Sequence, residues 1–161
     1  MSPQGTIHLL CGLPGTGKST FARELESRTN GVTLNHDVWL VGIFGPTASE
    51  DFEKHHSTVW RLLWQLAERL VSIGVDVILD FGLWHRCERD DFRERAAKIH
   101  APCRLYFVTC SLELQFRRID KRNSEVKDKN TIISPAMLTE FCRQFEVPAA
   151  EEGATVINTD G

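Results

Sequence analysis

The sequence has no excess of basic residues and no apolar run that approaches the length needed to cross a membrane. Its 19 Lys and Arg are outnumbered by 22 Asp and Glu, which gives a formal net charge of -3. Since sequence-independent binding to duplex nucleic acid needs a basic surface, duplex nucleic acid is not an expected partner. The first residues also lack a basic-then-apolar leader, so we expect a cytoplasmic protein that does not contact a membrane.

The cysteines lack the spacing of a metal or redox site. The five cysteines are odd in number and never form Cys-x-x-Cys, so we expect reduced thiols. No low-complexity tract is present, and charged residues at 25% and apolar residues at 42% are typical of a globular protein. A chain of 161 residues predicts one domain that spans residues 1–161.

The stretch from Gly12 to Thr20 has the residue pattern of a P-loop. The apolar run Thr6–Cys11 precedes it and a helical pattern follows it, so the glycines lie where a strand turns into a helix. A Gly-rich turn without a ligand is the alternative. The correct flanks favour the P-loop, because the motif has a mechanism only between a strand and a helix.

The residue types in this stretch suit the phosphates of a nucleoside triphosphate. Glycines let the backbone curl so that its N–H groups point at phosphate oxygens, and the following helix adds the positive end of its dipole. Lys18 can reach the β- and γ-phosphates, and the hydroxyl of Ser19 can ligate Mg²⁺. We therefore expect ATP and Mg²⁺ as cofactors. The expected nucleotide-binding residues are Gly12, Gly15, Thr16, Gly17, Lys18, Ser19 and Thr20.

Short apolar runs alternate with helical patterns along the rest of the chain. This alternation predicts a three-layer α/β fold of the P-loop NTPase type, with a five-stranded, mainly parallel sheet and helices on both faces. The expected strands are Thr6–Cys11, Val32–Asn35, Val75–Leu79, Arg104–Cys110 and Thr155–Asn158. The first expected helix follows the P-loop and ends near residue 30, with Gly31 at the C-cap. The other expected helices cover about residues 51–73, 88–99, 112–122 and 134–145. Residues 47–50 resemble a capping box, and residues 81–85 and 123–133 have the composition of irregular segments.

Two aspartates lie at the ends of expected strands, where ligands collect in a parallel α/β sheet. Asp80 has the position of a Walker-B aspartate that holds Mg²⁺ directly or through water; alternatively, it caps the next helix. Asp37 is a candidate general base for an acceptor hydroxyl; alternatively, it is an N-cap. We expect Asp37 and Lys18 to be catalytic, and Ser19 and Asp80 to hold the metal ion.

Phosphoryl transfer also needs positive charge near the leaving oxygens. Arg118 and Arg122 lie one helical turn apart before a polar segment, and we expect them to be catalytic residues of a lid around residues 121–134. Alternatively, they belong to a solvated helix face. Arg86 and Arg89 follow the third strand and are candidate substrate residues that face phosphate or the acceptor. Trp39, near the end of the second strand, is a candidate lining residue of an acceptor pocket.

With these residues in view, the chain resembles the small P-loop kinases of the polynucleotide-kinase, zeta-toxin and chloramphenicol-phosphotransferase group, which include predicted kinases of the AAA_33 type. The resemblance rests on the P-loop, Asp37, Asp80 and the run Lys121-Arg122-Asn123-Ser124, and it covers Thr6 to about Phe145. It implies an adenylate-kinase-like strand order 2-3-1-4-5. It also implies that Asp37 activates the acceptor and that Arg122 belongs to the lid.

One position departs from the pattern of the polynucleotide kinases. In that group an arginine three residues after the catalytic aspartate helps to bind the acceptor strand, and here that position is Leu40 within the apolar segment His36–Phe44. We therefore expect an ATP- and Mg²⁺-dependent phosphotransferase that moves the γ-phosphate to a hydroxyl of a small, partly apolar molecule. The alternatives are a polynucleotide 5′-hydroxyl kinase and a non-catalytic nucleotide-binding regulator. A GTPase switch is not expected, because the sequence lacks Asp-x-x-Gly after the third strand and lacks Asn-Lys-x-Asp.

Overall fold

The computed structural model describes residues 4–45, 51–127 and 132–161. In this part of the chain, parallel strands form a five-stranded sheet in the order β2-β3-β1-β4-β5. The strands are β1 Ile7–Cys11, β2 Val32–Asn35, β3 Val77–Gly82, β4 Cys103–Thr109 and β5 Thr155–Asn158. The helices are α1 Lys18–Thr29, α2 His36–Phe44, α3 Phe52–Ser72, α4 Arg86–Lys98, α5 Leu112–Glu125, α6 Pro135–Gln144 and the 3₁₀ turn η2 Ala150–Glu152. The expected α/β fold and the expected strand order are confirmed.

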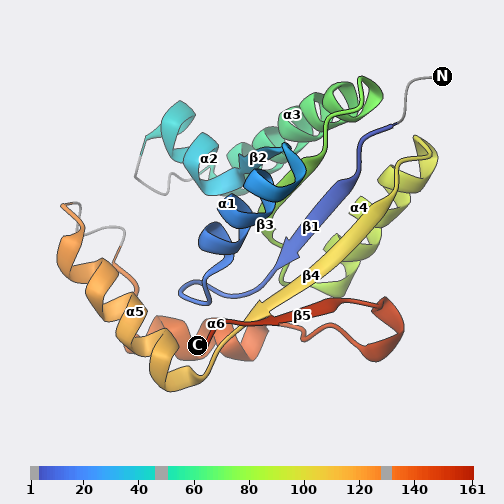
Figure 1. The fold of residues 1–161 in the computed structure, drawn as a ribbon. Helices are drawn as coiled ribbons and strands as arrows, with labels where there is room; N and C mark the ends of the chain where they lie inside the picture. The colour runs from blue at the N-terminus through green and yellow to red at the C-terminus, as the bar shows by residue number, and fades with distance from the viewer. Residues whose placement is uncertain (1–3, 46–50, 128–131) are drawn as a thin grey trace.

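Helices cover both faces of the sheet (Figure 1). Alternating side chains of the central strand β1 divide the core into two layers. Ile7 and Leu9 belong to the layer that contains the apolar faces of α3 and α4, whereas Leu10 belongs to the layer that contains α1. Successive side chains of a strand point to opposite faces, so helices on both faces bury every residue of β1 and β3. Double burial explains why these strands read as continuous apolar runs.

The third strand begins and ends later than the sequence predicts. It continues through Asp80 to Gly82, whereas residues 81–85 have the composition of an irregular segment. Asp80 is paired in register with Leu10 of β1 and with Asn35 of β2. The carboxylate therefore projects from within the sheet, close to its carboxyl edge.

Helix ends also differ from the expected bounds. At the end of α1 the left-handed residue is Asn30, with φ of 53°, because asparagine tolerates this conformation better than most other non-glycine residues. Gly31 is therefore not the C-cap. Helix α5 runs on to Glu125 through residues expected to be irregular. The segment after β2, which has no clear period in the sequence, forms α2. The expected capping box at residues 47–50 lies outside the described residues.

The carboxyl ends of the strands meet at one edge of the sheet. Figure 1 shows the P-loop at this edge, with α2 on one side of it and α5 on the other. These segments are far apart in the sequence, and the parallel strand order brings them together. Among the described residues, every helix is too short or too polar to span a lipid bilayer.

Candidate active site

The P-loop joins β1 to α1 and is shaped by its glycines. Gly15 and Gly17 have φ of 80° and 95°, a left-handed conformation that glycine adopts without strain. Gly17 is the N-cap of α1 and has no side chain, so the first N–H groups of the helix are left for an anion. At Gly12 the backbone approaches β4 so closely that a Cβ atom would lie 2.5 Å from the carbonyl oxygen of Val108.

A pocket of about 900 Å³ opens above the P-loop. The structure brings most of the sequence-predicted site residues into its lining, although they come from four separate segments. The expected residues that line it are Gly15, Gly17, Lys18, Ser19, Thr20, Asp37, Asp80, Arg118 and Arg122. Asn35, Val38, Asn158 and Thr159 also line it, and the sequence had not singled them out.

Lys18 lies within the P-loop, where its ammonium group donates a hydrogen bond to the carbonyl oxygen of Leu13 at 2.9 Å. Burial lowers the pKa of Lys18, while the negative charges of Asp80 and Asp37 oppose that shift. A bound phosphate would supply further negative charge and favour the ammonium form. The position therefore suits a lysine that holds the β- and γ-phosphates.

A hydroxyl and a carboxylate lie side by side at the pocket floor. The Ser19 hydroxyl donates to Oδ2 of Asp80 at 3.0 Å, and the same carboxylate oxygen accepts from Nδ2 of Asn35 at 2.7 Å. Oxygen donors of these two kinds are the ligands that Mg²⁺ prefers next to nucleotide phosphates, so the residues fit the expected metal ion. The alternative role of Asp80 as a helix cap does not hold, because the N-cap of α4 is His85.

Asp37 lies in the first turn of α2, and its side chain is 91% exposed. The carboxylate accepts a hydrogen bond from Nδ1 of His36 at 3.2 Å. This hydrogen bond lowers the pKa of Asp37, and the charges of Lys18 and Arg122 lower it further, so the carboxylate is ionised at neutral pH. Asp37 is not the N-cap of its helix: the Asn35 side chain accepts from the backbone of residue 38 instead.

The two arginines of the predicted lid have different environments. The Arg118 guanidinium donates to the hydroxyl and carbonyl oxygens of Thr159 at 2.8 and 2.9 Å, so it is tied to the end of β5. Arg122 is exposed at the pocket mouth, where its charge is close enough to lower the pKa of both Lys18 and Asp37. Of the two, Arg122 is therefore the better candidate for the expected lid role.

The predicted lid around residues 121–134 is partly helical, and a residue near its start is hydrogen-bonded to a residue near its end. Its first residues continue α5, and residues 128–131 lie outside the described part of the chain. The Asn123 amide group donates to the carbonyl oxygen of Ile133 at 2.8 Å, and its oxygen accepts from the Ile133 N–H at 3.1 Å. These two hydrogen bonds hold the ends of the intervening segment together.

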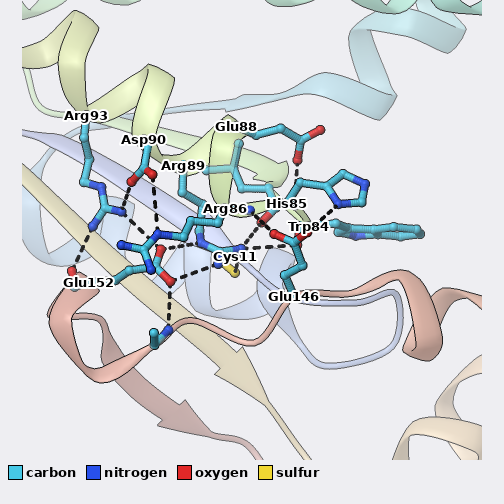
Figure 2. A network of polar contacts seen from close by, with 12 residues as sticks. Cys11, Trp84, His85, Arg86, Glu88, Arg89, Asp90, Arg93, Glu146 and Glu152 are labelled. Atoms are coloured by element: carbon cyan, nitrogen blue, oxygen red, sulfur yellow. Dashed lines mark hydrogen bonds and ion pairs between the residues drawn. The ribbon is translucent and has the colours of Figure 1, made fainter.

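Five expected site residues do not line the pocket: Gly12 and Thr16 of the P-loop, and Arg86, Arg89 and Trp39. Arg89 is fully buried, and its guanidinium forms a two-point ion pair with Glu152 at 2.8 and 3.0 Å. Arg86 binds Glu151 at 2.7 Å. Contacts of Arg86, Arg89 and Arg93 with Asp90 and Glu152 form a network that joins α4 to η2 (Figure 2). The expectation that Arg89 contacts the substrate is wrong, because its charge is already neutralised inside the protein. Trp39 is 41% exposed on α2 but is not part of the pocket lining.

Two neighbouring residues have partners that sequence reasoning missed. Asn35 contacts Asp80, and His36 contacts Asp37. A partial signal was present, because asparagine at a strand-to-helix junction is a favoured N-cap. No local pattern indicated that the asparagine would also reach β3, since that contact depends on the pairing of β2 with β3.

The strand order, the P-loop between β1 and α1, and the carboxylates beside it define a P-loop α/β protein of the nucleotide-binding type. A sequence model of the AAA domain family AAA_33 matches residues 7–148. The chain belongs to this family, as the resemblance implied. No curated protein matches the chain at a significant level.

Solved structures of kinases and related proteins have the same fold. Kti12 of Chaetomium thermophilum in complex with ADP-AlF3 has a TM-score of 0.74 at 16% identity, over 96% of this chain and 89% of that chain. A putative kinase from Chloroflexus aurantiacus has a TM-score of 0.77 at 16% identity, over 99% and 87%. The APS kinase of Mycobacterium tuberculosis, solved with AMPPNP and APS, has a TM-score of 0.69 at 20% identity, over 99% and 91%. At these identities the likeness shows the fold alone.

Proposed function

We propose that the protein is an ATP- and Mg²⁺-dependent phosphotransferase that moves the γ-phosphate of ATP to a hydroxyl of a small molecule. One observation carries the proposal: the ionised carboxylate of Asp37 lines the same pocket as the P-loop, Ser19 and Asp80. A protein that only binds nucleotide needs the phosphate and metal residues. It has no need of an additional carboxylate placed where an acceptor would enter.

Each residue has a defined part in the transfer. Lys18 and the P-loop amides hold the β- and γ-phosphates, and Ser19 and Asp80 hold Mg²⁺, which neutralises phosphate charge when bound. Asp37 accepts the proton of the acceptor hydroxyl as the hydroxyl oxygen bonds to the γ-phosphorus. The bond from that phosphorus to the bridging oxygen breaks, and ADP leaves with the electron pair. Arg122 stabilises the negative charge at the pocket mouth.

The surroundings of Asp37 favour a small, partly apolar acceptor over a polynucleotide end. The neighbouring residue in the pocket is Val38, and the next exposed side chains of α2 are Trp39, Val41 and Ile43. Leu40, at the position of the strand-binding arginine of polynucleotide kinases, packs against the core. Of the pocket cations, Lys18 serves the P-loop and Arg118 is tied to Thr159. A phosphodiester chain would find few basic partners next to Asp37.

The test is a transfer assay with γ-labelled ATP. The acceptors are a panel of hydroxylated metabolites, antibiotics and nucleosides, with a short oligonucleotide included as the polynucleotide probe. We expect a small acceptor to be labelled. Substitution Asp37→Asn should lower transfer at least about 100-fold, because a general base contributes about that much, while the affinity for ATP stays unchanged.

Three results would count against the proposal. Unaltered turnover in Asp37→Asn would remove Asp37 from the role of base. Labelling of the oligonucleotide, with a KM that rises with salt, would favour the polynucleotide kinase. Tight nucleotide binding without transfer to any acceptor would favour a regulator.

A further inference from the structure

We propose that Asn35 and His36 are positioning residues that hold the two acidic groups of the site, Asp80 and Asp37, in their working orientations. The proposal rests on the proposed function for the roles of those aspartates. Asn35 and His36 lie at the junction of β2 and α2. Asn35 lines the pocket, but Asp80 and Val38 engage both ends of its amide, so neither residue is expected to touch the acceptor or the phosphates. Each acts through the aspartate that it contacts.

The Asn35 side chain bridges two elements of the site. Its Nδ2 donates to Oδ2 of Asp80 at 2.7 Å, and its Oδ1 accepts from the N–H of Val38 at 2.9 Å. The orientation of the amide is unambiguous, because a carboxylate only accepts and a backbone N–H only donates. One side chain therefore joins the metal carboxylate on β3 to the first turn of the helix that carries Asp37.

This bridge depends on the register of the sheet. Asn35 is paired with Asp80 across the parallel strands, so both side chains leave the sheet at its carboxyl edge. The Asp80 oxygen that accepts from Asn35 also accepts from Ser19. Two donors on one oxygen set the direction of the carboxylate and leave the other oxygen to approach a metal ion.

The buried His36 side chain orients the exposed Asp37 carboxylate through a hydrogen bond. The imidazole is buried, with 3% of its surface exposed, whereas the Asp37 side chain is 91% exposed. The ionised carboxylate can only accept, so Nδ1 of His36 carries the proton in the 3.2 Å contact. An exposed carboxylate has free rotamers, and this hydrogen bond selects one of them.

The other side of the imidazole is enclosed. Its Nε2 is buried and has no hydrogen-bond partner among the residues that the structure describes, so a proton there would be left without an acceptor. The ring lies against His56, Trp60 and Phe81, at centroid distances of 4.3, 5.9 and 6.1 Å. These contacts fix the plane of the ring, and the ring in turn fixes the hydrogen-bond donor. The arrangement requires the neutral Nδ1–H tautomer.

The tautomer can be measured without any substrate. In ¹⁵N NMR spectra of the labelled protein at pH 7, Nδ1 of His36 should have the chemical shift of a protonated nitrogen and Nε2 that of an unprotonated one. The opposite pattern would overturn the proposed contact. This measurement is independent of turnover, so it separates failure of the positioning role from failure of the proposed function.

The functional test of His36 uses two substitutions that differ in one donor. His36→Phe keeps an aromatic ring in the enclosure and removes the donor, whereas His36→Asn places an N–H close to the position of Nδ1. We expect His36→Phe to lower kcat about 10- to 100-fold with little change in the KM for ATP, and His36→Asn to restore most of the loss. In an Asp37→Asn background, His36→Phe should have no further effect.

Trp60→Phe is the matched control for His36. It keeps an aromatic ring against His36 and removes an indole N–H that has no hydrogen-bond partner among the described residues, so kcat should remain at the wild-type value. Equal losses in His36→Phe and His36→Asn would show that packing alone matters and would overturn the role of the hydrogen bond. Unchanged kcat in His36→Phe would also overturn it.

The test of Asn35 separates its two contacts. Asn35→Ser keeps a hydroxyl that can cap α2 but is too short to reach Asp80, whereas Asn35→Ala removes both contacts. We expect the Mg²⁺ concentration for half-maximal turnover to rise about tenfold in both, with an additional fall in kcat only in Asn35→Ala.

Thr33→Val on the same strand is the control, because the buried Thr33 hydroxyl has no hydrogen-bond partner in the described part of the chain. If Asn35→Ser required no more Mg²⁺ than Thr33→Val, the bridge to Asp80 would have no functional role. Cooperative urea unfolding of each variant verifies that the comparison is made on folded protein. The Mg²⁺ dependence of ATP-analogue binding gives the same comparison where no acceptor is known.

Discussion

Breaking the buried ion pair between Arg89 and Glu152 by removing one charge should cost more stability than breaking an exposed ion pair. The guanidinium donates twice to the carboxylate, at 2.8 and 3.0 Å, and the two side chains are 0% and 1% exposed. Arg93 also donates to the same carboxylate at 3.1 Å. The perturbation is Glu152→Gln, which preserves the shape of the side chain and removes its charge.

Two independent considerations give a similar magnitude. Removal of one partner of a buried pair leaves an uncompensated charge and typically costs about 3–5 kcal/mol. The hydrogen bonds from Arg89 lower the pKa of Glu152 from 4.5 to about 2. At 1.36 kcal/mol for each pKa unit, that difference corresponds to about 3 kcal/mol of folding free energy at neutral pH. We therefore expect Glu152→Gln to lower the free energy of unfolding by about 3 kcal/mol.

Urea denaturation at pH 7 measures the effect. A carboxylate with a lowered pKa stabilises the folded state fully above its unfolded-state pKa, and the contribution is lost as the pH falls from about 4.5 toward 2. The difference between wild type and Glu152→Gln should therefore shrink over that pH range. The matched control is Glu151→Gln, which removes the exposed pair with Arg86 between the same two segments and should change the unfolding midpoint very little.

The double substitution Arg89→Met with Glu152→Leu completes the test. It removes both charges and fills the space with apolar atoms, so it should recover most of the stability lost in Glu152→Gln. Equal effects of Glu152→Gln and Glu151→Gln would refute the reasoning. So would a double variant that is no more stable than Glu152→Gln, because the cost would then not come from an unpaired buried charge.

Three further predictions concern the nucleotide site. Gly12→Ala should weaken ATP binding at least about tenfold in calorimetry, because its Cβ would lie 2.5 Å from the Val108 carbonyl oxygen and displace the P-loop; unchanged affinity would contradict the close approach. Ser19→Ala should raise the Mg²⁺ concentration for half-maximal turnover about tenfold without changing the fold, since it removes the hydroxyl beside Asp80; an unchanged Mg²⁺ titration would remove Ser19 from the metal site. Arg122→Ala should lower kcat about 10- to 1,000-fold at constant ATP affinity if its charge stabilises the transition state; a loss confined to KM would indicate that it only binds substrate.

Much of the candidate site could be predicted because its residues follow one another in the sequence. The P-loop shape depends on consecutive glycines and on a strand and a helix directly beside them, so a local pattern specifies it. The strands were predictable because both faces of the sheet are covered, and burial on both faces selects apolar runs. Asp37 and Asp80 could be placed near the P-loop because parallel strands end at a common edge.

The arginines show where local patterns stop being sufficient. Arg89 follows β3 as closely as a phosphate-binding arginine would, yet its partner Glu152 lies 63 positions later in the sequence. Arg118 and Arg122 are one turn apart on the same helix, and only the position of Thr159 at the end of β5 separates their environments. A charged side chain has no intrinsic partner, so its role depends on which segment the tertiary fold places beside it.

By itself, the sequence determined the fold class, the phosphate-binding loop and the edge of the sheet where function would be found, because each of these follows from backbone preferences and from the period of apolar residues. Only the tertiary structure decided which carboxylate each polar group would hold. Asn35 reaches Asp80 because β2 and β3 are paired in one particular register, and His36 is enclosed because α3 and β3 supply rings around it. Such contacts join residues distant in sequence, and their geometry is set by the packing of whole elements.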